Sequence, residues 1–221
     1  SSGRNLTEYD ALTFWVKGSQ AATLNEVGFG TDFGLNKYNV ILQNVSIGTN
    51  WQKVIIPIPD ASKLVQEKGL FWYSEGSENA LGYTFWIDNV KYEKLGTIAH
   101  AQPKILNGNN TSEQTFIGSV TTLSGLTDTF NMADGSNKTV SIAPSYFTFT
   151  SSNPSVATVS ELGVVNVIGS GSVVITATLG GVAAQGKLTL TSLGVFTPAP
   201  TPTQAQANVL SIFSDTYTNV P

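Results

Sequence analysis

The histidine and carboxylate side chains are the residues that catalysis or metal binding would need. His100 is the only histidine, and the chain has no cysteine. A histidine-based catalytic triad and a histidine-rich or thiolate zinc site are therefore excluded. Glu75 and Glu78 lie in the turn-like stretch SEGSEN, whereas glycoside hydrolysis needs two carboxylates that face each other across a cleft. Asp60 follows a proline and is expected to cap a short helix. We predict no catalytic site in this chain; a catalytic domain elsewhere in a longer parent protein stays open.

The tryptophans offer a different chemistry, which is the stacking of sugar rings. A pyranose presents C–H groups that pack against an aromatic face, while its hydroxyls hydrogen-bond to amide or carboxylate side chains. All four tryptophans, Trp15, Trp51, Trp72 and Trp86, precede residue 90. From about Ala99 the sequence is dominated by Thr, Ser, Val, Gly and Ala. We therefore expect any sugar-binding surface in the first part of the chain.

Composition and charge exclude several classes of partner. The formal net charge is −4 and only 12% of residues are charged, so a basic surface for nucleic acid is not expected. No apolar run approaches the roughly 20 residues that span a bilayer. The absence of cysteine fits both a cytosolic protein and a bacterial exported one. The sequence begins with Ser1 and carries no signal peptide, so we interpret it as a piece of a longer protein.

The elements that must position the tryptophans read as β-strands. Short alternating runs separated by turns predict strands at 11–17, 25–30, 38–44, 51–58, 69–74 and 83–93. Further runs predict strands at 147–151, 155–160, 163–169, 172–179 and 182–192, with Gly180-Gly181 as a hairpin turn. Only DASKLVQEK, residues 60–68, reads as a short helix. The pattern predicts an all-β protein made of sandwiches.

Changes in composition predict the domain boundaries. We expect one domain at 1–98, a second at 103–192, a Pro/Thr linker at 193–207 and the start of a further module at 208–221. The first boundary falls near 97–102, which places His100 in a linker.

The second domain resembles the group 2 bacterial immunoglobulin-like domains. The resemblance rests on FTFTSSNPSVATVSELGVVNVIGSGSVVITATLGG, residues 147–181, with its Ser-Asn-Pro turn, Val-Ala-Thr-Val strand and Gly-x-Gly before Ile-Thr-Ala. It implies an immunoglobulin-like β-sandwich that acts as a spacer, with Ile175 facing its core.

The first domain resembles the later strands of a jelly-roll carbohydrate-binding module. The resemblance rests on LTEYDALTFWVKGS (6–19), TNWQKVIIPIPD (49–60), GLFWYSEG (69–76) and YTFWIDNVKYE (83–93). The family has further strands before LTFW, and without them a sheet edge is expected to be open. The alternative is that these strands lie upstream of residue 1. The tail VLSIFSDTYTNV resembles the opening of another such module in secreted polysaccharide-degrading proteins of marine and gut Bacteroidetes.

The resemblance makes Trp72 the first choice as a stacking platform. The family pattern turns Phe71 and Tyr73 toward the core and Trp72 outward, on a sheet shared with 25–30 and 38–44 that commonly bears the ligand. The residues expected to bind sugar hydroxyls there are Glu26, Asn39 and Gln43. The alternative is a Trp72 ring buried under a loop.

The same pattern puts Trp15 and Trp86 on neighbouring strands of the other sheet, beside residues 51–58, and turns both outward. With Ile55 they would form an apolar patch, which packs against a neighbouring domain or a loop more often than against sugar. Trp51, at the entry to its strand, is expected in the core.

Asp88 lies among aromatic residues, where a carboxylate must be solvated, hydrogen-bonded or bound to a cation. Related modules carry a structural Ca²⁺ with this aspartate as one ligand, so the resemblance implies a structural calcium site at Asp88. A solvated or backbone-bonded Asp88 is the alternative, because calcium needs roughly 6–8 oxygen ligands.

Two functions therefore compete. The first is non-catalytic polysaccharide binding, with a β-glucan such as laminarin favoured, by a module with an immunoglobulin-like spacer in a secreted or outer-membrane surface protein. The second is an adhesin or structural stalk whose domains act as spacers. A third interpretation is that the face of Trp15, Ile55 and Trp86 packs against an adjacent domain of the same chain, namely a catalytic one.

Overall fold

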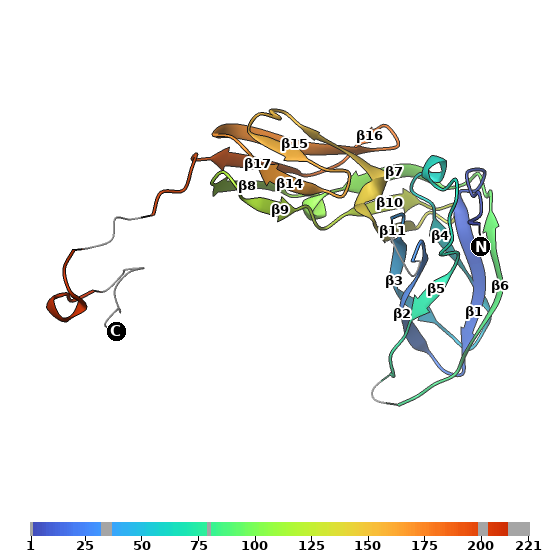
Figure 1. The fold of residues 1–221 in the computed structure, drawn as a ribbon. Helices are drawn as coiled ribbons and strands as arrows, with labels where there is room; N and C mark the ends of the chain where they lie inside the picture. Colours follow the sequence, from blue (N-terminus) through green and yellow to red (C-terminus); the bar gives the residue numbers. More distant parts are fainter. Residues whose placement is uncertain (1, 32–36, 79–80, 199–202, 212–221) are drawn as a thin grey trace.

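The computed structural model describes residues 2–31, 37–78, 81–198 and 203–211. Within these ranges the regular elements are β-strands and short 3-10 turns, as the sequence predicted (Figure 1). The strands of the first part are β1 (Ala11–Gly18), β2 (Ala22–Phe29), β3 (Val40–Ile47), β4 (Gln52–Pro57), β5 (Trp72–Ser74) and β6 (Phe85–Glu93). Those of the second part are β7 (Ala99–Lys104), β8 (Asn110–Thr115), β9 (Val120–Thr122), β10 (Thr127–Asn131), β11 (Asn137–Ile142), β12 (Phe147–Ser151), β13 (Ala157–Val159), β14 (Val164–Val167), β15 (Gly171–Leu179), β16 (Val182–Ala183) and β17 (Lys187–Ser192).

The first part is a sandwich of two antiparallel layers. One layer has the strand order β4-β1-β6, and the other contains β5-β2-β3. The predicted distribution of the tryptophan-bearing strands between the two layers is confirmed. Alternation along β1 turns Leu12, Phe14 and Val16 into the core, where each is fully buried. Burial of such side chains contributes roughly 1.5–3 kcal/mol each.

The second part also forms layered sheets. One has the order β12-β15-β17-β8 and another the order β13-β14-β9. The Gly180-Gly181 hairpin is confirmed, because Leu179 pairs with Val182 across it. Ile175 on β15 is fully buried, as expected, in a cluster with Val165, Val173 and Leu190.

The two parts share one sheet. The layer that contains β5-β2-β3 continues into β11-β10-β7 of the second part, because β3 pairs with β11. The register joins Ile41 to Ser141 and Val40 to Ile142. The Ala143 N–H extends this ladder by donating to the Asn39 carbonyl at 2.9 Å. Figure 1 shows the two sandwiches at an angle to each other, like the two arms of an L.

The hydrophobic core also crosses the junction. Tyr146, in the 3-10 turn Pro144–Tyr146, is buried in the same cluster as Phe29 and Val40 of the first part. Its ring packs edge-on against Tyr38, with centroids 5.4 Å apart, and its hydroxyl donates to the Tyr38 carbonyl at 3.1 Å. Sheet and core together therefore join the two sandwiches.

Several local expectations are wrong or lie outside the described part. Residues 60–68 form only the 3-10 turn Ala61–Lys63, capped by Asp60 as predicted, because Asp60 Oδ1 accepts from the Ser62 N–H. His100 lies in β7, not in a linker, because residues 99–104 pair with β10. The division at 1–98 and 103–192 stays a prediction. The further module predicted at 208–221 falls mainly on residues 212–221, outside the described residues.

Candidate functional site

The outer face of the layer β4-β1-β6 carries exposed tryptophans. Since Phe14 and Val16 face the core, Trp15 and Lys17 must face away from it. Lys17 lies opposite Trp86 on β6, and Trp15 lies between Lys53 on β4 and Asp88 on β6. Trp15 and Trp86 are 38% and 45% exposed, so the outward orientation predicted for both is confirmed.

Trp51 belongs to this face, and its predicted place in the core is wrong. It is 43% exposed. Val54 and Ile56 point inward on β4, so the odd-numbered residues from 51 to 55 point outward. Ile55, expected in the apolar patch, lies half-buried on this strand.

Lys17 is held between two of these rings. Its Nζ lies 5.0 Å from the centroid of the Trp51 ring and 5.1 Å from that of Trp86. Both distances are within the range of cation–π attraction, which is worth about 0.5–1 kcal/mol at an exposed site. We call Trp15, Lys17, Trp51 and Trp86 the tryptophan platform. Because it lies on a sheet, its rings cover one broad surface.

Removing the Trp51 ring is expected to have little effect on stability. Trp51→Ala should lower the free energy of unfolding by about 1 kcal/mol, the scale of its contact with Lys17. Phe14→Ala, which deletes a fully buried ring of the same layer, should cost about 3–5 kcal/mol. Urea unfolding of both variants tests this, and equal losses would mean that Trp51 is part of the core.

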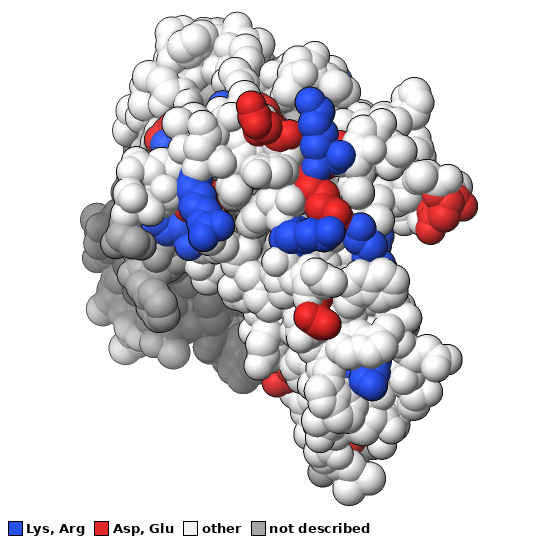
Figure 2. Space-filling model, turned by 90° about the vertical axis from the view of Figure 1, so that its right-hand side faces the viewer, with Lys and Arg blue, Asp and Glu red and all other residues white. Residues whose placement is uncertain are grey.

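A charged cluster borders the platform. Glu93 accepts hydrogen bonds from Lys53 Nζ at 2.6 Å and from Thr13 Oγ1 at 2.7 Å, and it pairs with Lys91 at 2.8 Å. These contacts, led by that of Lys53, lower the pKa of Glu93 to about 2. The single carboxylate therefore pairs with both lysines and offsets one of their two positive charges. Figure 2, turned so that the β6 side of Figure 1 faces the viewer, shows charged atoms gathered in a band on an otherwise mostly uncharged surface.

The other predicted sugar-binding residues lie on the opposite layer, so the structure does not bring them to the platform. Trp72 is only half-buried, and its Nε1 lies over Gly28 without a hydrogen-bond partner among the described residues. Gln43 Nε2 donates to Glu26 Oε1 at 2.9 Å, across the β2–β3 pair. Asn39 Oδ1 accepts from Thr31 Oγ1 at 3.1 Å. These polar groups are already partnered, and the Trp72 ring is less accessible than those of the platform.

Asp88 is exposed on β6. Its Oδ1 accepts from the N–H of Asn89, which has a φ of 56° at a β-bulge opposite Phe14. No group of three or more acidic or histidine side chains that could hold a metal occurs within the described residues. A single carboxylate does not fit a calcium site, which needs several oxygens. The structural calcium stays a prediction. The hydrogen bond from the Asn89 N–H to Asp88 agrees with the alternative of a backbone-bonded Asp88.

Glu75 and Glu78, the acidic residues considered for catalysis, accept hydrogen bonds from the backbone of β2. Glu75 Oε2 accepts from the Asn25 N–H at 2.7 Å, and Glu78 Oε1 accepts from the Thr23 N–H at 2.6 Å. Both carboxylates therefore tie the 75–78 loop to β2 and do not form an opposed acid–base pair.

A family model described as "Intimin, immunoglobulin-like domain" matches residues 139–181. The matched stretch runs from β11 to the hairpin after β15, inside the region expected to be immunoglobulin-like. This part of the chain is similar to an immunoglobulin-like domain, which is typical of non-catalytic modules. The search among curated proteins gave no match. The comparisons found no catalytic family and show no carbohydrate-binding module.

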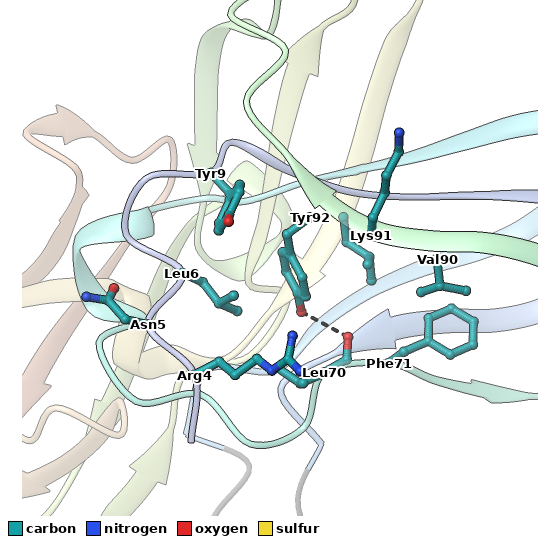
Figure 3. Close-up of a pocket in the computed structure, with 10 residues that line it drawn as sticks. Arg4, Asn5, Leu6, Tyr9, Leu70, Phe71, Val90, Lys91 and Tyr92 are labelled. Carbon is teal, nitrogen blue, oxygen red and sulfur yellow. Dashed lines mark hydrogen bonds between the residues drawn. The ribbon is translucent and has the colours of Figure 1, made fainter. Parts of the chain in front are cut away.

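The first sandwich is open on the side between β5 and β6. Within the described residues β6 pairs only with β1 and β5 only with β2, so an edge of each layer is free, as the sequence led us to expect. A cavity of about 350 Å³ lies there, and Figure 3 shows Tyr92 donating its hydroxyl to the Leu70 carbonyl at 2.9 Å within it. A wider cavity of about 510 Å³ shares Phe71 with it and is lined by further aromatic rings.

Among the described elements, no helix is long and apolar enough to cross a membrane.

Sequence reasoning found two of the three platform tryptophans and missed Trp51. The signal that identifies Trp51 was present. In WQKVIIPI, Lys53 and Trp51 stand two and four residues before Ile55, so a strand with Ile55 outward turns Trp51 outward as well.

Proposed function

We propose that this chain binds polysaccharide without catalysis, through the tryptophan platform, and that its immunoglobulin-like part is a spacer in an extracellular or cell-surface protein. The observation that carries the proposal is the exposure of Trp15, Trp51 and Trp86 around Lys17 on one sheet face. The platform, and not the face of Trp72, is then the binding surface.

The chemistry of the platform supports this function. Exposed aromatic rings on a sheet suit the C–H faces of successive sugars, and each good aromatic contact is worth about 0.5–1.5 kcal/mol beyond area burial. An extended chain of sugars needs a surface more than a deep pocket. Neighbouring strands lie about 4.8 Å apart. Trp86 lies on β6 and Trp51 directly precedes β4, on the two sides of β1, so the two residues are separated by about 10 Å. One polysaccharide chain laid across the strands can contact both rings.

Single-residue variants test which face binds. With any polysaccharide retained by the parent chain in affinity electrophoresis, Trp86→Ala should weaken binding by about 1–2 kcal/mol, or roughly 5–30-fold, through the lost contact and area. Trp72→Ala should leave binding close to that of the parent. Phe196→Ala removes a ring that is 60% exposed and lies far along the chain, and serves as the control.

Two outcomes contradict the proposal. Retardation lost in Trp72→Ala but kept in Trp86→Ala would move the binding face to the layer β5-β2-β3. No retardation on any glycan of a panel that includes laminarin and other β-glucans, together with acidic polysaccharides, would remove polysaccharide binding altogether.

The alternative function is an adhesin or stalk, in which the platform packs against an adjacent domain of the same protein. The match of residues 139–181 to an intimin immunoglobulin-like domain favours it. Iodide quenching of tryptophan fluorescence distinguishes the two functions in the full-length parent protein. Quenching of Trp86 there as strong as in this chain would leave the platform free and contradict packing against a neighbour.

A further inference from the structure

Lys17 differs from the other lysines on its layer. Lys53 and Lys91 both pair with Glu93. Within the described residues the Lys17 ammonium forms no ion pair and donates no hydrogen bond, and the Trp51 and Trp86 rings lie about 5 Å from it. The acidic residue nearest to it in the strand register is Asp88, whose Oδ1 accepts from the Asn89 N–H. A positive charge therefore lies at the centre of the platform, and no described residue accepts a hydrogen bond from it.

The surroundings of the Lys17 ammonium favour a negatively charged ligand over a neutral one. Two aromatic rings at about 5 Å replace part of the water around the ammonium, and a partly desolvated charge interacts more strongly with an opposite charge. Laying a neutral sugar over Lys17 would remove more water from the ammonium without supplying an anion, which costs free energy. A ligand with a carboxylate or sulfate group at that point removes this cost and accepts a charge-assisted hydrogen bond.

We propose that the ligand of the tryptophan platform is an anionic polysaccharide, whose carboxylate or sulfate groups bind Lys17 while the flanking sugar rings pack on Trp51 and Trp86. This inference rests on the proposed function and names its substrate class. It replaces the neutral β-glucan favoured by the sequence. The chain as a whole has a net charge of −4, so general electrostatic attraction opposes a polyanion and binding must come from the local site.

The test measures the binding of polygalacturonate, dextran sulfate, laminarin and dextran to the intact chain by affinity electrophoresis and calorimetry. The parent should bind at least one of the two anionic polymers and should bind neither neutral polymer as tightly. Lys17→Met keeps the length of the side chain and removes its charge. It should weaken binding of the anionic polymer about tenfold or more, the scale of a hydrogen bond to a charged group. Raising the salt concentration should weaken the parent more than the variant.

Lys187→Met is the matched control. It changes the net charge equally, at an exposed position on β17 in the second sandwich, and should bind like the parent. Trp86→Ala should also weaken anionic binding, because the same ligand uses both features. Circular dichroism of each variant shows whether the fold is kept.

The outcomes separate this inference from the proposed function. Tight binding of a neutral glucan, lost in Trp86→Ala and unchanged in Lys17→Met, would overturn the anionic ligand and keep polysaccharide binding. Equal losses in Lys17→Met and Lys187→Met would mean non-specific ion attraction and overturn the inference. An absence of binding to all four polymers would count against both.

Discussion

Asp128→Asn is expected to stabilise the chain at pH 8 by up to about 4 kcal/mol. Asp128 lies on β10, in the sheet that joins the two sandwiches, and is fully buried between Pro103 and Val140 of the neighbouring strands. Neither carboxylate oxygen has a hydrogen-bond partner of ordinary geometry among the described residues. Burial raises the pKa of Asp128 to about 7, and the backbone N–H groups of Gln102 and Thr129 offset only part of this rise.

The sign of this effect, a stabilisation that appears at high pH, follows from proton linkage. A carboxyl group with a raised pKa holds its proton more tightly in the folded state than in the unfolded state. The free energy of unfolding of the parent is therefore unaffected by Asp128 ionisation below a pH of about 4. It falls progressively as the pH rises to about 7. Asparagine carries no charge at either pH, so the variant and the parent should differ little near pH 4 and most above pH 7.

Urea unfolding at pH 4 and pH 8 measures the difference between the variant and the parent at each pH, so the titration of Glu93 cancels. Asp134→Asn is the control, because Asp134 is exposed and contacts with Ser136 lower its pKa. The free energy of unfolding of Asp134→Asn at pH 8 should not exceed that of the parent. A difference between Asp128→Asn and the parent that is the same at both pH values would show that Asp128 is not buried as a protonated acid.

Tyr146→Ala is expected to destabilise both sandwiches, by about 3–5 kcal/mol in the free energy of unfolding, because it deletes a buried aromatic ring. Tyr146 lies in the core that the two parts share and contacts Tyr38 of the first part. Tyr146→Phe keeps the ring and loses only the hydrogen bond to the Tyr38 carbonyl, which should cost about 1 kcal/mol.

Ile175→Ala is the comparison that shows which sandwich each substitution destabilises. Ile175 belongs to the separate cluster of the second part, and its truncation should cost about 2–5 kcal/mol there. Tryptophan fluorescence reports on the first part alone, since all tryptophans precede residue 90. Tyr146→Ala should shift the fluorescence transition in urea, and more so than Ile175→Ala. A fluorescence transition unmoved by Tyr146→Ala would mean that the first sandwich does not depend on the shared core.

The sequence predicted the all-β class because alternation of apolar residues marks the strands. The grouping of strands in the first sandwich was implied by the resemblance to a jelly roll and is confirmed. The inward position of Ile175 was implied by the resemblance to immunoglobulin-like domains, and it is confirmed. The helix expected at 60–68 did not form beyond one 3-10 turn. Its apolar residues are too few to hold a longer helix against the core, since only Leu64 between Asp60 and Val65 is buried.

The candidate site was predicted only in part. The resemblance implied the outward orientation of Trp15 and Trp86, but it did not predict the limited accessibility of Trp72, whose Nε1 lies over Gly28. The contact of Lys17 with two rings depends on the register of three strands, which pattern alone does not give. The pairing of β3 with β11 joins segments about 100 residues apart, and no local signal marks it.

The pairing of β3 with β11 also determines how the platform is presented. Two sandwiches connected by a flexible linker would sample many mutual orientations. Here, backbone hydrogen bonds between β3 and β11 and a common core instead hold the two sandwiches in one mutual orientation (Figure 1). Every copy of the chain then presents its platform at the same angle to its immunoglobulin-like arm. Copies held side by side on a surface would present parallel platforms to one long polymer, so that the second and later contacts form at a high effective concentration.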